Sequence, residues 1–247
     1  MAKRGSESSG KVAGKAVGNV VALAGSQAAT VVPIAVRRPK LLIVTSPKGG
    51  VGKTTAAIHL AVAAALDNLS VVTADLDAQA TLTRWWNQRN ETQQNPVFPH
   101  VQVSWDDVPD LAAKELDCDL VVVDTPTSVE ERMDQIKPLL ICADYIIVPV
   151  RENFFDIESA IPWMQQIQGY GKPATFFLNQ VRKGTKQFER GKKRLNMIAN
   201  LCPIEMPGYT QVASVAEFGL SILDVKNGKG ADDFHGVWKF VKRGLEL

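Results

Sequence analysis

The sequence predicts an α/β protein whose sheet is doubly wound, mostly parallel and covered by helices on both faces. Beyond residue 40, short apolar segments alternate with helical ones, which is the order that right-handed crossovers between parallel strands produce. Two of the apolar segments, 121–123 and 145–148, are apolar throughout, as expected for strands buried on both faces. The predicted strands are 41–46, 70–75, 119–124, 144–149, 174–179 and 202–206.

Length and composition limit the remaining architecture. The chain has 247 residues, of which 45% are hydrophobic, and this suits one domain of about 200 residues with an extension. The segment from Asn87 to Pro109 contains three prolines and is predicted to be the least regular part. No apolar run reaches about 18 residues, so no membrane-spanning helix is expected.

The three cysteines lack the spacing of a zinc site or a paired redox motif. Cys118, Cys142 and Cys202 each lie in or beside an apolar segment, and no C-x-x-C pattern occurs. We expect them to be buried thiols in a reducing cytoplasm, because free cysteine packs as a small hydrophobic residue.

Residues 1–40 are predicted to be a flexible basic arm that precedes a domain at 41–247. The arm is rich in Gly, Ser, Ala, Lys and Val, and its seven Lys/Arg against one Glu give a balance of +6. The remainder holds 21 Lys/Arg against 25 Asp/Glu, a balance of −4. Gly and polar residues interrupt the arm's apolar stretch too often for a secretory signal, which favours a cytoplasmic arm.

A glycine-rich segment lies between the first predicted strand and an Ala-rich helical stretch from Ala56 to Leu66. It reads Pro-Lys-Gly-Gly-Val-Gly-Lys-Thr-Thr over residues 47–55. A strand, a glycine turn and a helix form the context of a phosphate-binding loop, in which backbone N–H groups and the helix dipole surround an anion. We expect Lys53 to reach the β- and γ-phosphates of a nucleotide and the Thr54 hydroxyl to ligate Mg²⁺. A glycine-rich turn without a ligand is the weaker alternative.

The loop departs from G-x-x-x-x-G-K-[ST], because its first glycine would fall on Pro47, and a second lysine, Lys48, opens it instead. This resembles the deviant Walker A motif of the ParA/MinD superfamily of ATPases, which have the P-loop NTPase fold. The resemblance implies that Lys48 crosses a dimer interface to the partner's nucleotide and that Lys48 and Lys53 are catalytic. The implied nucleotide-binding residues of the loop are Lys48, Gly49, Gly50, Val51, Gly52, Lys53, Thr54 and Thr55.

Two carboxylates, Asp75 and Asp77, emerge as the predicted strand 70–75 ends. Paired acids beside a phosphate loop are suited to supporting Mg²⁺ and orienting water. The stretch is similar to the superfamily's D-x-D-P-Q motif, which implies that Asp77 is the catalytic acid and Asp75 lies near the metal. Ala78 stands in place of the usual proline and Ala80 in place of a common glycine, so the rigidity of this loop is open. An Asp pair that only caps the next helix is the alternative.

Two further strand ends carry candidate site residues. Asp124 ends an apolar strand, the Walker B arrangement, and is expected to hold Mg²⁺ through water. Asn179 ends another, and the resemblance implies that it recognises the adenine edge of the nucleotide. An Asn that terminates a strand in a turn explains this residue nearly as well.

Positive charge is concentrated a second time between residues 182 and 194, where seven basic residues stand against one glutamate. Two separated basic regions in an otherwise acidic chain favour a polyanionic partner, although a solvated helix face is the usual explanation of such a run. The candidate DNA-binding residues are Arg182, Lys183, Lys186, Arg190, Lys192, Lys193 and Arg194.

The resemblance extends from about residue 41 to the end and is closest to small plasmid-type ParA partition ATPases. It implies a slow, partner-stimulated ATPase that uses ATP and Mg²⁺ and forms an ATP-sandwich homodimer. In its ATP state the protein would bind DNA non-specifically, associate with the nucleoid in the cytoplasm, and segregate plasmid, chromosome or other cargo with a ParB-like or other adaptor.

Two other functions compete with this interpretation. A MinD-like membrane-associated positioning ATPase requires a free amphipathic helix at the C-terminus, and five apolar residues between 234 and 245 do share a face. A terminal helix packed on the sheet explains that face better. A metabolic P-loop ligase is less favoured, because no pocket motif for a small acid is evident.

The aromatic residues are interpreted mainly as packing. Trp85 and Trp86 are adjacent and cannot share one helix face, so we expect one to be buried and one to lie near an interface. His59 lies on the helix that follows the glycine-rich loop and is expected to be a packed residue, not a base.

Overall fold

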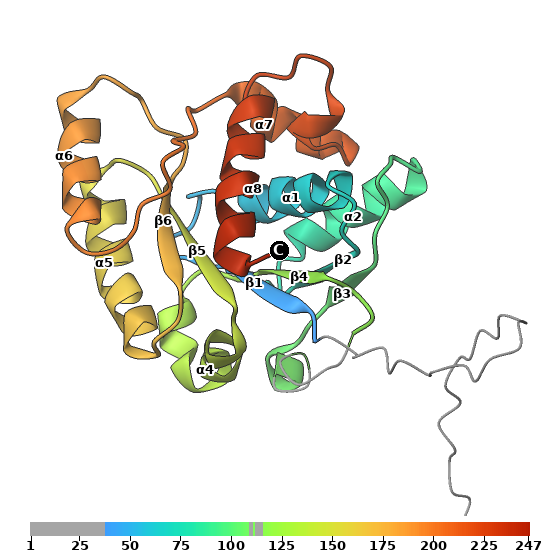
Figure 1. Cartoon of the computed structure of the whole chain (residues 1–247), viewed down its shortest axis with the longest axis horizontal. Helices are drawn as coiled ribbons and strands as arrows, with labels where there is room; N and C mark the ends of the chain where they lie inside the picture. Colours follow the sequence, from blue (N-terminus) through green and yellow to red (C-terminus); the bar gives the residue numbers. More distant parts are fainter. Residues whose placement is uncertain (1–37, 109–110, 112–115) are drawn as a thin grey trace, which may run out of the picture. The chain divides into compact units, whose positions relative to one another are not determined.

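The computed structural model describes residues 38–108, 111 and 116–247, so the predicted arm lies outside the described residues except for its last three positions. Six strands form one sheet in the order β3-β2-β4-β1-β5-β6, and all the pairings are parallel (Figure 1). The predicted doubly wound parallel sheet is confirmed. The strands are β1 (Lys40–Val44), β2 (Val71–Asp75), β3 (His100–Gln102), β4 (Leu120–Asp124), β5 (Tyr145–Val150) and β6 (Ala174–Leu178).

The register of the central strands brings the candidate site residues to one edge of the sheet. Asp124 at the end of β4 pairs with Val44 on one side and with Asp75 on the other. Thr45 and Ser46 connect Val44 to the glycine-rich loop, and ligand sites in sheets of this kind lie beyond the carboxyl ends of the strands. Two acids that are 49 positions apart therefore lie beside the loop.

The structure differs from the predicted strands in two places. Segment 202–206 is not a strand: it runs along β6 with single bridges only at its flanks, Leu201 to Phe176 and Pro207 to Val181. The proline at position 203 has no N–H to donate to a ladder. Conversely, β3 lies inside the segment predicted to be irregular. The sequence did not predict this strand, because an edge strand of three half-exposed residues has few apolar residues to indicate it.

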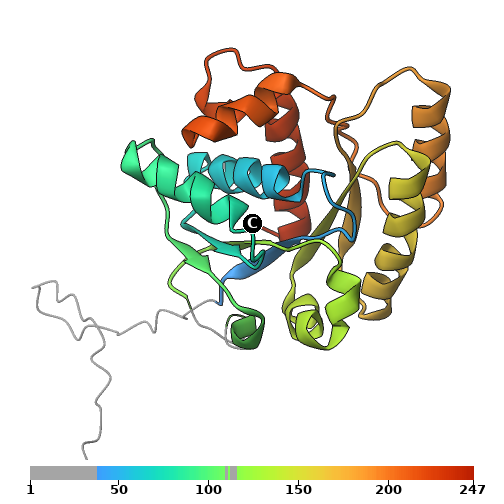
Figure 2. The same ribbon diagram turned by 180° about the vertical axis from the view of Figure 1, so that it is seen from behind.

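Helices cover both faces of the sheet (Figures 1 and 2). One face carries α1, α2, α7 and α8, and the other carries α4, α5 and α6; each layer encloses its own buried apolar cluster. The helices are α1 (Lys53–Leu66), α2 (Thr81–Glu91), α4 (Met133–Cys142), α5 (Phe154–Gly169), α6 (Lys186–Asn196), α7 (Thr210–Ser214) and α8 (Ala231–Leu245). Short 3₁₀ turns lie at η1 (Trp105–Asp107), η2 (Val129–Arg132), η3 (Val215–Phe218) and η4 (Ile222–Asp224).

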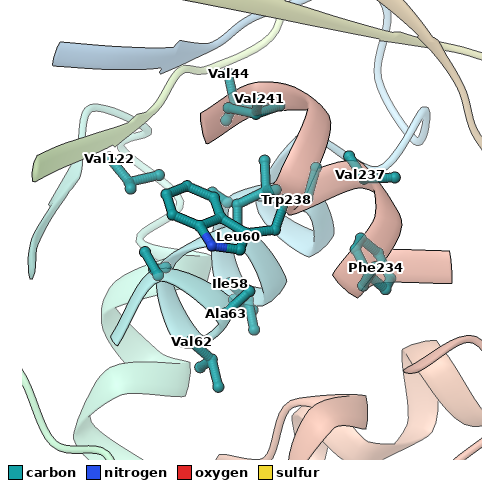
Figure 3. Packing of buried hydrophobic residues seen from close by; sticks show 14 of the residues in the cluster. Val44, Ile58, Leu60, Val62, Ala63, Val122, Phe234, Val237, Trp238 and Val241 are labelled. Carbon is teal, nitrogen blue, oxygen red and sulfur yellow. The ribbon is translucent and has the colours of Figure 1, made fainter. Parts of the chain in front are cut away.

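The apolar face of α8 packs on the sheet. Figure 3 shows the Trp238 indole between Leu60 of α1 and Val122 of β4. The five residues that share this face are all buried, and the Trp238 Nε1–H donates to Asp67 at 3.0 Å. The packed terminal helix is therefore the correct explanation, and the face is not free to enter a bilayer. Among the described residues, no helix is both long and apolar enough to span a membrane. The buried residues of this face are Phe234, Val237, Trp238, Val241 and Leu245.

The adjacent tryptophans divide as expected in burial: Trp85 is buried, whereas Trp86 is half-buried and donates its Nε1–H to the carbonyl of Phe98 at 2.6 Å. The prediction of buried cysteines is correct for Cys202 but wrong for Cys118 and Cys142, which are half-buried near the ends of elements.

Candidate functional site

The glycine-rich loop has a backbone that only glycine adopts without strain. Gly50 and Gly52 have φ values of 72° and 87°, in the left-handed region. A Cβ on Gly52 would also lie 2.2 Å from Nδ2 of Asn179, so a side chain at this position would have to displace Asn179. The helix α1 begins at Lys53, immediately after this glycine, and includes the predicted helical stretch from Ala56 to Leu66. Its first N–H groups therefore point out of the helix toward the loop, where they are available to an anion.

Lys53 is almost fully buried and folds back over the loop. Its Nζ donates to the carbonyl of Lys48 at 3.0 Å. Burial lowers the pKa of Lys53, while the negative charges of Asp124, Asp77 and Glu130 oppose that shift. An ammonium held on a neutral carbonyl in a cradle of N–H groups suits a phosphate, which offers a charged and stronger acceptor.

Thr54 and Asp124 form the closest polar contact of the site. The Thr54 hydroxyl donates to Oδ2 of Asp124 at 2.5 Å. Asp124 is 1% exposed, and its Oδ1 has no hydrogen-bond partner in the described part of the chain. Burial raises the pKa of Asp124 to about 7; the Thr54 hydrogen bond and the charge of Lys53 lower it, and the charges of Asp75 and Asp77 raise it.

These residues fit a magnesium ion. Buried carboxylate oxygens are almost always hydrogen-bonded, and an orphaned one beside a hydroxyl is a donor set that a hard cation accepts. Mg²⁺ in nucleotide sites takes one or two protein oxygens together with substrate phosphates, a share that Thr54 and Asp124 could supply. The metal role of these two residues stays a prediction.

Asp75 organises the loop that carries Asp77. Asp75 is fully buried, and its Oδ1 accepts the backbone N–H of Asp77 at 3.0 Å. Its Oδ2 accepts both the N–H and the hydroxyl of Thr83, at 2.9 and 2.8 Å. Both oxygens are thus occupied by protein donors, and a metal role for Asp75 stays a prediction. The sequence analysis gave Thr83 no role in the site, because a single Thr on a helix does not indicate which residues it contacts.

Asp77 itself is half-buried and close enough to Lys53 for its charge to oppose the lowering of the Lys53 pKa. Its Oδ1 accepts the N–H of Gln79 at 2.9 Å. Ala80, three residues further on, has a φ of 53°, which is the left-handed conformation that a glycine would adopt at no cost. The loop therefore holds a strained alanine at the start of α2.

Asn179 holds the glycine-rich loop through a side-chain hydrogen bond. The side chain is buried, and its Nδ2 donates to the carbonyl of Val51 at 2.9 Å. Asn179 also lines a cavity of about 780 Å³ that adjoins Thr55 and is walled by residues 151–153, 179–182 and 206–210. This volume lies beside the loop where the remainder of a bound nucleotide would extend. Adenine recognition by Asn179 stays a prediction.

His59 is packed, as predicted, and also links two distant segments. Its fully buried ring stacks on Phe234 with centroids 4.2 Å apart. The Nδ1–H donates to the carbonyl of Thr55 at 2.7 Å, and Nε2 accepts the N–H of Ile222 at 3.1 Å. Burial lowers the pKa of His59 to about 4, so the ring is neutral and this tautomer satisfies both nitrogens.

The predicted basic surface lies on and before α6, but its charges are not equivalent. Lys183 and Lys192 both contact Glu205, and Arg194 pairs with Glu158. Within the described ranges no ion pair is formed by the side chains of the other four residues, Arg182, Lys186, Arg190 and Lys193. The last three are exposed and spaced by four and three residues, so they form one stripe along the helix, which we call the α6 stripe.

The chain belongs to a known nucleotide-binding family. The family model described as the CobQ/CobB/MinD/ParA nucleotide binding domain matches residues 42–222, nearly three quarters of the sequence. The matched span contains the glycine-rich loop and the strand ends that carry Asp75, Asp124 and Asn179, and it stops before α8. The family predicted from the sequence is therefore confirmed.

Solved structures with the same fold include proteins of three kinds. A plasmid partition protein of Borrelia burgdorferi B31 bound to AMPPNP has a TM-score of 0.65 and 18% identity, covering 83% of this chain and 100% of its own. The septum site-determining protein MinD of Pyrococcus horikoshii OT3, in complex with Mg-ADP, has a TM-score of 0.66 and 14% identity, covering 83% and 96%. An ATP complex of McdA from Cyanothece has a TM-score of 0.63 and 14% identity, covering 85% and 97%. A comparison with curated proteins finds no match. At these identities the likeness establishes the fold.

Proposed function

We propose that this protein is an ATP-dependent, dimerising partition or positioning ATPase. The observation that carries the proposal is the Thr54–Asp124 contact with its orphaned, buried oxygen beside the glycine loop. Family membership supports nucleotide binding, and the structural neighbours with AMPPNP, Mg-ADP and ATP support ATP with Mg²⁺ as the ligand pair.

Each group of residues at the site binds a different part of the nucleotide or its metal ion. Backbone N–H groups from Gly49 to Thr55 surround the phosphates, and the Lys53 ammonium exchanges the Lys48 carbonyl for a phosphate oxygen. Thr54, and Asp124 through water, would hold Mg²⁺, which would neutralise charge on the phosphate oxygens. Asp77 orients the attacking water, because it is the accessible carboxylate of the pair while Asp75 is enclosed by donors. The base and ribose occupy the cavity beyond Thr55, next to Asn179.

Dimerisation depends on Lys48. The side chain is exposed at the tip of the loop, while its own carbonyl holds Lys53. A second protomer facing this edge of the sheet receives Lys48 at its bound nucleotide, so ATP joins the two copies and hydrolysis releases them. The nucleotide thereby controls any surface that requires both copies.

The ATP dimer binds duplex DNA without sequence preference through the α6 stripe. Phosphate contacts by exposed Lys and Arg give such binding, and doubling the stripe strengthens it. The protein then works on the nucleoid in the cytoplasm with a ParB-like or other adaptor that stimulates slow hydrolysis. The buried face of α8 disfavours the membrane-bound alternative.

Co-sedimentation with plasmid DNA or with anionic vesicles, each with and without ATP, tests this function. We expect ATP-dependent pelleting with DNA and none with vesicles. ATP-dependent pelleting with vesicles alone would favour a membrane-positioning ATPase instead, and pelleting with neither would remove the DNA-binding proposal. Lys53→Ala serves as the nucleotide-binding control in both arms.

A further inference from the structure

A chain of hydrogen bonds links the edge strand β3 to the loop that carries Asp77. The hydroxyl of Thr73 contacts Nδ1 of His100 at 2.9 Å, and Nε2 of His100 contacts the hydroxyl of Thr83 at 2.9 Å. The Thr83 hydroxyl donates to Asp75 at 2.8 Å, and Asp75 accepts the backbone N–H of Asp77 at 3.0 Å. Hydrogen bonds therefore connect residues of β2, β3 and α2 in one series that ends at the carboxylate of Asp75.

The Asp75 carboxylate at one end of this series of hydrogen bonds determines which atom donates in each of them. Asp75 as a carboxylate can only accept, so the single hydroxyl proton of Thr83 is directed to it. The Thr83 oxygen must then accept from His100, which places the imidazole proton on Nε2 and leaves Nδ1 to accept from Thr73. Burial lowers the pKa of His100, which keeps the ring in this neutral form.

The ring of His100 is also held sterically. Trp86 of α2 stacks on it with centroids 5.3 Å apart and planes 23° from parallel. Thr73 and Asp75 are both fully buried, whereas His100 and Thr83 are half-buried. Thr73 and Asp75 therefore cannot exchange a lost partner for water without cost. Hydrogen bonds that are connected in this way polarise and strengthen one another.

We propose that His100 is a positioning residue for Asp77, acting through Thr83 and Asp75. The inference rests on the proposed function, in which Asp77 orients water. Ala78 follows Asp77 and fixes the backbone less than a proline would. His100 supplies from the neighbouring strand the rigidity that the loop sequence lacks: it holds Thr83, Thr83 holds Asp75, and Asp75 holds the Asp77 backbone.

A matched pair of substitutions tests this role. His100→Phe keeps the ring on Trp86 but removes both nitrogens, whereas His100→Gln keeps one acceptor and one donor on a planar group. We expect His100→Phe to lower kcat for ATP hydrolysis about tenfold with little change in nucleotide affinity, and His100→Gln to restore most of the rate. In an Asp77→Asn background, His100→Phe should cause no further loss, because both changes act on the same carboxylate.

A measurement on the unaltered protein is independent of activity and of variant folding. ¹⁵N NMR of labelled histidine should show His100 as the neutral tautomer protonated on Nε2. A proton on Nδ1 would overturn the inference. So would a His100→Phe protein that folds, as judged by its Tm, and keeps the wild-type kcat.

Failure of the inference is distinguishable from failure of the proposed function. If wild-type protein does not hydrolyse ATP, or Asp77→Asn hydrolyses it at the wild-type rate, the proposed function and the inference both fail. If Asp77→Asn is impaired and His100→Phe is not, the inference alone fails. His235→Phe, an exposed histidine on α8, is the control and should behave as wild type throughout.

Discussion

The Thr54 hydroxyl donates a 2.5 Å hydrogen bond to Oδ2 of Asp124, although the two residues are 70 positions apart. The other oxygen of Asp124 is buried without a partner among the described residues. The contact joins the start of α1 to the end of β4, and it assembles the part of the site that the proposed Mg²⁺ requires. The ionisation of Asp124 is consequently sensitive to what occupies the site.

Asp124 is expected to make the stability of the nucleotide-free protein depend on pH. Its pKa is raised from 3.8 to about 7, so the folded state binds the proton more tightly than the unfolded chain does. Stability should therefore fall as the pH rises from about 4 to about 7 and then level off, by up to about 4 kcal/mol from this group. Urea unfolding of wild type and Asp124→Asn across this range checks the sign: the variant should lack this decline. An equal decline in both proteins would show that another group causes it.

Lys53→Ala should weaken ATP binding by one charge-assisted contact, about 1.5–3 kcal/mol or roughly ten- to a hundredfold in Kd. The Lys48 carbonyl loses its donor at the same time, but it faces the open loop and can accept water. Titration with a fluorescent ATP analogue measures the change, with Lys137→Ala on the exposed side of α4 as the matched control. Equal affinity in the two variants would contradict the assignment of the phosphate loop.

Ala80→Gly should stabilise the fold by about 1 kcal/mol, because alanine at a φ of 53° carries a strain that glycine does not. Ala78 has no positive φ, so Ala78→Gly should destabilise or be neutral. Chemical denaturation of both variants gives the comparison. A loss of stability in Ala80→Gly would mean that the strain is absent in solution.

The α6 stripe and the paired lysines beside it should contribute unequally to DNA binding. Replacing Lys186 and Lys193 by Gln should weaken ATP-dependent binding and reduce the salt slope of log K by about 0.9 for each lost phosphate contact. Replacing Lys183 and Lys192, which already contact Glu205, removes the same formal charge and should have less effect. Titration of each double variant with unrelated DNA duplexes at several salt concentrations measures the two salt slopes. Equal slopes for both double variants would exclude the stripe as the main DNA surface.

The sequence predicted the parts of the fold that depend on local pattern. Five of the six strands and the start of α1 follow from apolar runs and the glycine turn, because buried parallel strands must be apolar. The edge strand β3 was missed, because half-exposed residues next to a proline resemble a loop. Segment 202–206 was predicted to be a strand, but its backbone N–H groups donate to β6 only at Cys202 and Met206.

The sequence predicted those residues of the candidate site that lie in recognisable local motifs. The loop at 47–55 and the acids at strand ends carry recognisable spacing, and the register of β1, β2 and β4 brings them together. The contacts of His100 with Thr83 and of His59 with Ile222 join distant positions through single side chains. No periodicity reveals such contacts, and the carboxylates that neutralise part of the α6 charge were missed for the same reason.

Lys48→Ala should separate nucleotide binding from switching. The variant keeps the cradle and Lys53, so its ATP affinity should remain close to that of wild type, while its hydrolysis and ATP-dependent dimerisation should be impaired. Affinity and turnover measured on the same preparation test this. A Lys48→Ala protein that hydrolyses ATP at the full rate as a monomer would contradict the shared-nucleotide dimer.

In the proposed function, ATP joins two copies of the chain, and hydrolysis, which requires Asp77, separates them. Light scattering on Asp77→Ala with MgATP, with MgADP and without nucleotide tests it most directly. We predict a mass of twice 26.9 kDa with MgATP alone, stable over time because hydrolysis is lost, and a monomer in the other two conditions. A monomer under all three conditions, with ATP shown to be bound, would contradict the account.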